Sequence, residues 1–183
     1  MLERKRSRGS LLVDWSTVLS IAATALMVAV PGLRTFVHES QRCSVVNQLQ
    51  QEMRQASRSA GQLGHTVTLC ASARGSERCA EHGNWSNGWI AFVDMNGDGQ
   101  MQNDEAKLRL WRTENTQQNI VVAAAPAVFS FHPYFARPYL GTEPGHLVVC
   151  DRKGYGGSRM IEVDRSGAPR LADAGRKNCN VSA

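Results

Sequence analysis

The stretch from Leu11 to Leu33 reads LLVDWSTVLSIAATALMVAVPGL, an apolar run interrupted by one ionisable residue, Asp14. A helix of about 20 apolar residues crosses a bilayer, so the run is long enough to span a membrane. The basic residues Arg4, Lys5, Arg6 and Arg8 precede it directly. Because basic flanks tend to stay in the cytoplasm, the sequence predicts one span, with everything after Leu33 on the far side.

Three interpretations of this N-terminus compete: a secretory signal peptide, a signal anchor, and a leader that is cut before the apolar run. The run exceeds the apolar core of a signal peptide, about 7 to 15 residues, although Ala23 and Ala25 imitate a small-residue cleavage site. Asp14 favours the third interpretation, because an unpaired carboxylate in a bilayer costs about 3 kcal/mol on insertion scales. Cleavage after Gly9 would make Ser10 the new N-terminus and bring Asp14 within reach of an α-amino group.

Composition and charge describe an ordinary globular chain. Its 183 residues suit one domain plus a membrane segment, and 42% hydrophobic with 20% charged residues argues against wholesale disorder and against several membrane spans. The formal net charge is +5, and the charged residues among the first eight contribute +3 of it. Bulk charge therefore gives little reason to propose nucleic-acid binding.

Five cysteines follow the export-like N-terminus, and none forms a CxxC pair: Cys43, Cys70, Cys79, Cys150 and Cys179. In an exported chain this pattern favours disulfides over metal or redox chemistry. The odd count leaves one thiol over, and Cys43 is the best candidate because it falls in the predicted helix.

Residues 34–63 continue the span as a predicted amphipathic helix. After Pro31 and Gly32, which are expected to kink it, apolar residues recur in steps of three or four. They are Val45, Leu49, Met53, Ala56, Ala60 and Leu63. We expect this stripe to pack on the soluble domain until Gly61 and Gly64 end the helix.

Residues 64–183 predict a β-rich globular domain. Seven short runs alternate with turn residues: HTVTLC, GWIAFV, KLRLWR, NIVVAA, VFSF, HLVVC and RMIEV. The predicted fold class is α+β, with a long N-terminal helix packed on an antiparallel sheet or sandwich.

The N-terminal layout resembles the type IV prepilin leader. Residues 1–9 form a basic leader that ends in Gly9, Asp14 would be the fifth mature residue, and Pro31 lies about two-thirds along the apolar stretch. The family prefers Phe or Met at the first mature position and Glu at the fifth, where this chain has Ser10 and Asp14. The resemblance implies cleavage between Gly9 and Ser10 by a prepilin peptidase, and it makes Asp14 the residue that pairs with a neighbour's terminal amine during assembly.

The soluble part resembles the FimT and GspH type of minor pilins and pseudopilins. The matching motifs are Thr68-Leu69-Cys70, then Cys79, then Trp85 to Gly99 in the pattern W-x-x-GW-x-x-F-x-D-x-NGDG, and Val149-Cys150-Asp151. Their spacing favours the disulfides Cys70–Cys79 and Cys150–Cys179. Trp85 and Trp89 are interpreted as packing residues and not as a ligand platform.

The resemblance implies a structural subunit of a type IV pilus, held in the bacterial inner membrane with its C-terminal domain in the periplasm before it enters a filament. Its implied partners are other pilins or pseudopilins and the prepilin peptidase. Two alternatives stay open: a GspH-type pseudopilin of a type II secretion system, and a pilin that binds DNA during natural transformation.

A calcium site is the one cofactor hypothesis that the sequence offers. Residues 94–105, DMNGDGQMQNDE, fit the EF-hand loop template, with ligand positions at Asp94, Asn96, Asp98, Gln100 and Glu105. The flanking runs read as strands and not helices, and Asn, Gly and Asp also suit a hairpin turn. The alternative is therefore a tight turn without metal.

No catalytic constellation stands out. The five histidines, at positions 38, 65, 82, 132 and 146, show no metal-ligand spacing, and no Ser or Cys lies in a nucleophile motif. The sequence therefore argues against an enzyme.

Some FimT-like pilins bind DNA through a C-terminal Gly-Arg-x-Arg motif. The matching stretch here is Gly167-Ala168-Pro169-Arg170, which lacks the first arginine. The candidate DNA-binding residues are Arg165, Arg170, Arg176 and Lys177. The alternative is a solvated basic tail, offset by Asp151, Glu162, Asp164 and Asp173.

Overall fold

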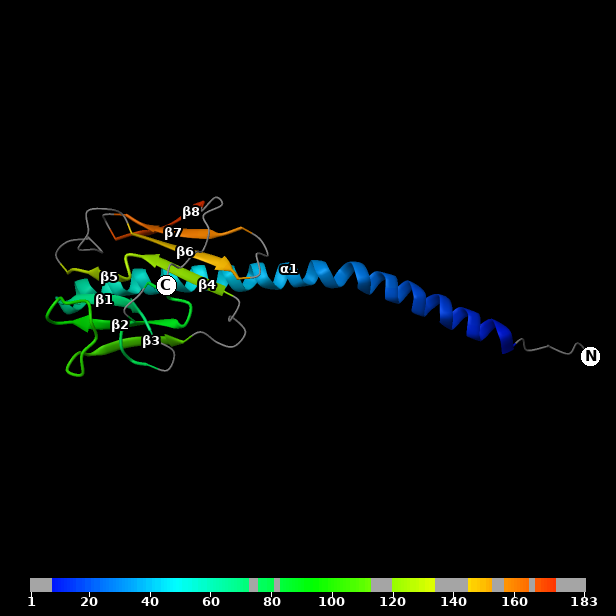
Figure 1. Cartoon of the computed structure of the whole chain (residues 1–183), viewed down its shortest axis with the longest axis horizontal. Helices are drawn as coiled ribbons and strands as arrows, with labels where there is room; N and C mark the ends of the chain where they lie inside the picture. The colour runs from blue at the N-terminus through cyan, green and yellow to red at the C-terminus, as the bar shows by residue number, and fades with distance from the viewer. Residues whose placement is uncertain are drawn as a thin grey trace, which may run out of the picture. The chain divides into compact units, whose positions relative to one another are not determined.

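The first element of the fold is helix α1, which runs from Arg8 to Leu63 and contains Pro31. The structure, a computed structural model, describes residues 8–72, 76–80, 83–112, 120–133, 145–152, 157–164 and 167–173. The chain forms two compact units that meet between His38 and Glu39. Within the described ranges, eight strands follow α1, and all of them belong to the second unit (Figure 1).

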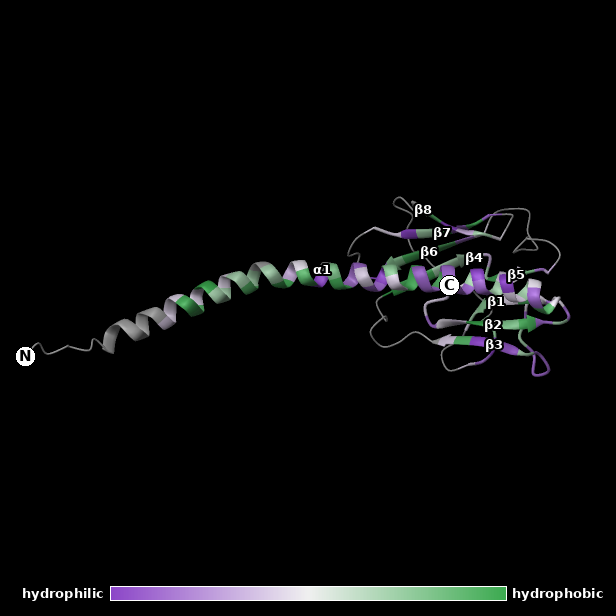
Figure 2. Cartoon of the chain, turned by 180° about the vertical axis from the view of Figure 1, so that it is seen from behind, coloured by the Kyte–Doolittle hydropathy of each residue, from purple (hydrophilic) through white to green (hydrophobic). Residues whose placement is uncertain are grey.

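The first unit exposes the apolar side chains of α1. Between Trp15 and Leu33, the large hydrophobic side chains that the structure describes are each at least two-fifths exposed. α1 is the one helix in the described residues that is long and apolar enough to cross a membrane. Figure 2 shows the hydrophobic colouring of this part of α1 and the mixed colouring of its later turns.

In the second unit, one stripe of α1 packs on the strands. Val45, Leu49, Met53, Ala56 and Ala60 are almost fully buried and share one hydrophobic cluster with residues of both sheets. These five positions of the predicted stripe are confirmed. The sixth is wrong, because Leu63 is the last helical residue and is about half exposed.

Gly64 ends α1. Its φ of 70° lies in the left-handed region that glycine enters without steric cost, and its amide donates to the Ala60 carbonyl at 3.0 Å. Gly61, the other predicted helix end, stays inside the helix.

The first sheet has the order β3-β2-β1-β5, with every pair antiparallel. Its strands are β1 (Thr66–Ala71), β2 (Gly88–Asp94), β3 (Lys107–Arg112) and β5 (Val128–Phe131). One face contributes Leu69, Trp89 and Phe129 to the main core with α1. The other face carries Cys70, Ile90 and Phe92, which form a second cluster. This sheet is therefore apolar on both faces.

The second sheet has the order β4-β6-β7-β8, again antiparallel. Its strands are β4 (Ile120–Ala125), β6 (Gly145–Asp151), β7 (Arg159–Val163) and β8 (Pro169–Asp173). Alternate residues such as Val122, Leu147 and Ile161 enter the main core. All seven predicted strands are present, and the predicted fold class is confirmed.

Strand β8 was not predicted. Proline lacks a backbone N–H, and a run that begins with Pro169 does not read as a strand. The structure tolerates this proline because β8 is an edge strand that pairs with β7 alone. The turn between them contains Gly167, with a φ of 82°, whose amide donates to the Asp164 carbonyl at 3.0 Å.

Trp85 and Trp89 lie in the core, which confirms their interpretation as packing residues. Trp85 and Trp89 are at most 1% exposed. Trp89 stacks on Trp111 with ring centroids 4.0 Å apart, and Trp85 meets Phe129 edge-on at 5.7 Å. These ring contacts join β2, β3 and β5 to the segment before β2.

Candidate functional site

The loop between β2 and β3 contains the calcium-like motif, and Asp94 organises its first half. The Asp94 carboxylate is 2% exposed and accepts the amides of Gly97 and Gly99, at 2.6 and 3.0 Å. Both glycines have a positive φ, near 75°, which explains why the motif needs glycine at these positions. The sequence N-G-D-G therefore folds the loop back onto the end of β2.

Glu105 closes the second half of the loop. Its two carboxylate oxygens accept the amides of Met95 and Gln102, each at 3.0 Å. Asp98 is exposed and accepts the Gln100 amide at 2.7 Å. This backbone hydrogen bond is the main reason that the pKa of Asp98 is lowered.

Two hydroxyls anchor the loop to the first sheet. Thr68 on β1 donates to Asp94 Oδ2 at 2.8 Å, and its hydroxyl also lies 2.8 Å from the Ser130 hydroxyl on β5. All three side chains are buried on the face that carries Cys70 and Phe92. Thr68 and Ser130 are contacts that sequence reasoning missed. They become neighbours of Asp94 only through the register of three strands.

The loop forms a tight turn that its own hydrogen bonds hold together. In the part of the chain that the structure describes, no group of three or more His, Cys, Asp or Glu side chains is placed to hold a metal ion. The four carboxylate oxygens of Asp94 and Glu105 all accept hydrogen bonds from the protein. Asp98 Oδ2 accepts the side-chain amides of Asn96 and Gln102. The loop therefore satisfies its own acceptors.

Calorimetric titration of the purified chain tests the calcium hypothesis. We expect no saturable heat at millimolar calcium, because a bound ion would compete with these hydrogen bonds for the same carboxylate oxygens. A saturable heat that disappears in Glu105→Gln would contradict this expectation and would establish a calcium site. Arg54→Ala, a substitution of an exposed residue on α1, is the matched control and should leave the titration unchanged.

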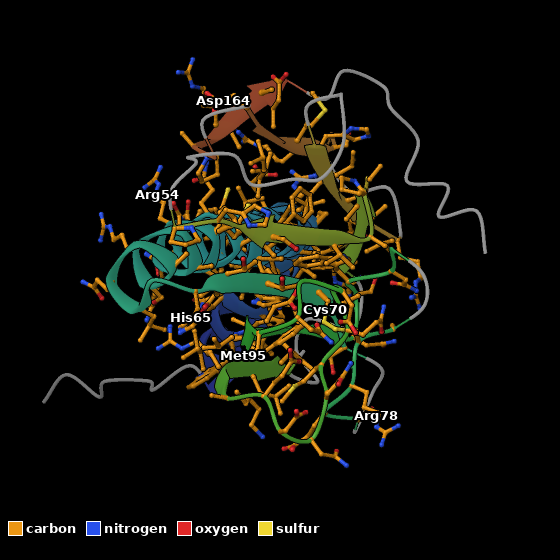
Figure 3. The ribbon with its side chains drawn as sticks, turned by 90° about the vertical axis from the view of Figure 1, so that its left-hand side faces the viewer. Arg54, His65, Cys70, Arg78, Met95 and Asp164 are labelled. Carbon is orange, nitrogen blue, oxygen red and sulfur yellow. A yellow bond between two sulfur atoms is a disulfide. The ribbon has the colours of Figure 1, made fainter. Side chains whose placement is uncertain are left out.

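The predicted disulfide between Cys70 and Cys79 is confirmed, with Cα atoms 5.5 Å apart. Figure 3 shows it beside the label of Cys70, with Arg78 at the periphery of the domain. The loop that it closes is tied to the neighbouring β3 by an ion pair between Glu77 and Lys107 at 2.5 Å. Cys43 is a free, partly exposed thiol, as predicted, 3.6 Å from Glu39 Oε1. Cys150 is disulfide-bonded, and Cys179, its predicted partner, lies outside the described residues.

Other predicted site residues are only partly described. Gly9, Ser10 and Asp14 are in α1, but the structure does not describe their side chains. Arg165, Arg176 and Lys177 lie outside the described residues. Arg170 is on β8, where its Nε is 3.3 Å from Asp164 Oδ2 and its strand partner is Glu162. Of the four DNA candidates, only Arg170 can be placed.

An ion network around the buried Arg42, which the sequence analysis missed, joins α1 to the second sheet. The Arg42 side chain is 3% exposed, forms an ion pair with Glu39 and donates to the Gly157 carbonyl. Arg159, the first residue of β7, reaches the same Glu39 carboxylate at 2.9 Å. Burial lowers the pKa of the Arg42 guanidinium, and Arg159 lowers it further, whereas Asp151 opposes the shift.

A second ionic contact ties α1 to the first sheet. Glu52 is 2% exposed, accepts from the side-chain amide of Gln48 at 2.8 Å, and pairs with Arg109 of β3 at 3.1 Å. Arg109 also donates to the side chain of Gln55 at 3.0 Å. The two networks fix α1 against both sheets, because a shift of the helix would separate Glu39 from Arg159 and leave Glu52 buried without its ionic partner.

The comparisons with known proteins agree with this fold. The family described as "Type II transport protein GspH" matches residues 45–167, more than half of the chain. No curated protein sequence matches significantly.

Two crystal structures of the type IV minor pilin FimU from Pseudomonas aeruginosa strain PAO1 are similar in fold, each at 14% sequence identity. One has a TM-score of 0.57 and covers 75% of this chain and 92% of that one. The other has a TM-score of 0.53, with coverages of 70% and 90%. The family match and this fold lead to one assignment: the chain belongs to the GspH family and is a subunit of the minor pilin or pseudopilin class.

Proposed function

We propose that this chain is a minor subunit of a type IV pilus, held in the bacterial inner membrane by the first half of α1 until it is drawn into the filament. The observation that carries the proposal is the bare apolar surface of that helix. Leu19, Ile21 and Leu26 are each more than 60% exposed, and Met27 is 78% exposed. Such a surface needs either lipid or the helices of other subunits around it.

The polar groups within this helix support burial in an apolar medium. The hydroxyl of Ser20 donates to the Thr17 carbonyl at 3.0 Å, and that of Thr24 donates to the carbonyls of Ser20 and Ile21 at 3.1 and 2.9 Å. Hydroxyls satisfied within their own helix avoid most of the cost that an unpaired polar group incurs in hydrocarbon. The segment can therefore enter a membrane without leaving the hydroxyls of Ser20 and Thr24 unpaired.

The remaining steps of the proposal concern processing and topology. A prepilin peptidase would remove residues 1–9 and leave Ser10 as the first mature residue. The basic leader would stay in the cytoplasm and the globular domain would enter the periplasm. The disulfide between Cys70 and Cys79 supports this topology, because disulfides persist in the oxidising periplasm. We further infer that the role is structural and that the domain catalyses no reaction.

The second candidate is a pseudopilin of a type II secretion system, which the description of the matching family favours. Deletion of the gene in its own host separates the two candidates. We expect loss of surface pili and of twitching, with secretion of exoproteins unchanged. Lost secretion with normal piliation would establish the type II alternative.

DNA binding is a further alternative, and the position of Arg170 bears on it. The guanidinium already faces Asp164, and the strand register places Glu162 opposite. An arginine that contacts phosphates contributes a salt-dependent share of the affinity for DNA. We expect Arg170→Ala to leave retention of double-stranded DNA at about 50 mM salt unchanged. A clear drop in retention, restored by Arg170→Lys, would instead assign a DNA contact to β8.

A further inference from the structure

Trp89 carries a buried hydrogen-bond donor that has no protein acceptor among the described residues. The side chain is 1% exposed, and its indole Nε1 is buried without a partner. The neighbouring Trp85 differs, because its Nε1 donates to the Ala127 carbonyl at 3.2 Å. A buried N–H without an acceptor costs about 1 to 3 kcal/mol, so Trp89 is an exception among the core aromatics that needs an explanation.

A small cavity, partly open to solvent, lies beside this indole. Its volume is about 10 Å³, and its walls come from α1, β2, β3, β4 and the segment before β2. The lining residues are Val45, Trp85, Ser86, Trp89, Trp111, Ile120 and Val122. The size corresponds to one water molecule.

The cavity has a second polar wall. The Ser86 hydroxyl lines it and accepts the Val122 amide at 3.0 Å. A buried water needs two or more polar partners, and an indole N–H together with a hydroxyl meets that requirement. The remaining walls are apolar side chains and aromatic rings.

We propose that a single bound water molecule in this cavity accepts a hydrogen bond from Trp89 Nε1 and bonds to the Ser86 hydroxyl. It lies where α1 meets strands of both sheets, so it is part of the core packing between them. This inference is independent of the filament in which the subunit functions, because it rests on the core of the globular domain alone.

The test is an NMR measurement on the full chain in detergent micelles, with ¹⁵N-labelled tryptophan and the indole signals assigned by Trp→Phe variants. The Trp89 indole proton is expected to show a direct cross-relaxation peak to water, of the sign that marks a long-lived bound molecule. Trp85 is the internal control, and its indole proton is expected to show no such peak because it is bonded to Ala127. Absence of the peak at Trp89 would overturn the proposal.

A second variant tests the other partner of the water. Ser86→Ala removes the hydroxyl and is expected to weaken the Trp89 water peak at least about twofold, because a buried water with a single partner exchanges faster. The Trp85 signal should keep its chemical shift, which shows that the core is intact. An unchanged Trp89 water peak in this variant would remove Ser86 from the site.

Discussion

The variant Asp14→Ala should insert stably in the membrane but should no longer appear in sheared filaments. In the proposed assembly, Asp14 pairs with the terminal amine of a neighbouring subunit in an apolar environment. Truncating one partner of such a buried pair costs about 2 to 5 kcal/mol, so we expect the filament fraction to fall about thirtyfold or more. The measurement is quantitative immunoblotting of filament and membrane fractions.

Two controls make this result specific to the charge. Asp14→Glu keeps the carboxylate and supplies the residue that the pilin family prefers, so it should assemble normally. Ser16→Ala changes an exposed neighbour on the same helix and should also assemble. Normal assembly of Asp14→Ala would contradict the proposed role of this residue.

The second large effect is expected at Arg42. Arg42→Ala removes a buried guanidinium while Glu39 and Asp151 keep their negative charges at the junction of α1 with β6 and β7. Breaking a buried ion pair from one side costs about 3 to 5 kcal/mol, and the partial exposure of Glu39 puts our expectation at the lower end, about 3 kcal/mol. Urea unfolding of the purified chain, followed by near-ultraviolet circular dichroism, measures the change.

The matched control for Arg42 is Arg54, an exposed arginine on the same helix (Figure 3). Arg54→Ala should change the free energy of unfolding by less than about 0.5 kcal/mol. If Arg42→Ala also changes it by less than about 1 kcal/mol, the network does not fix the helix on the second sheet as the contacts suggest.

Local periodicity explains why much of the fold could be predicted. The stripe from Val45 to Ala60 follows the helical repeat, and strands such as Gly88–Asp94 are bounded by turn residues. The short spacing of Cys70 and Cys79 identified the one disulfide that the structure describes completely. The residues that give each of these signals lie close together in the sequence, so the signals can be recognised without knowledge of the tertiary structure.

Contacts between strands left weak signals in the sequence or none. The bonds of Asp94 with Thr68 and of Thr68 with Ser130 depend on the register of β2, β1 and β5, which no short stretch encodes. The template for residues 94–105 therefore suggested metal ligands but did not show that Asp94 and Glu105 accept the loop's own backbone amides. In both readings the same glycines are needed for the turn.

The ion network had a signal that was available in the sequence. Arg42 lies three residues before Val45 and seven before Leu49, so it continues the buried stripe with a charged residue. Glu52, three residues after Leu49 and four before Ala56, lies on the same side. A charged residue at a stripe position predicts an ionic partner: Arg42 pairs with Glu39 on the same helix, and Glu52 pairs with Arg109 of β3.

The N-terminal sequence and intact mass of the membrane-extracted protein, from cells with and without a prepilin peptidase, test the central claim most directly. The account predicts a chain that starts at Ser10 when the peptidase is present and at Met1 when it is absent. A start beyond Ala25, or at Met1 in both strains, would contradict it, because a chain so processed would not enter the filament pathway.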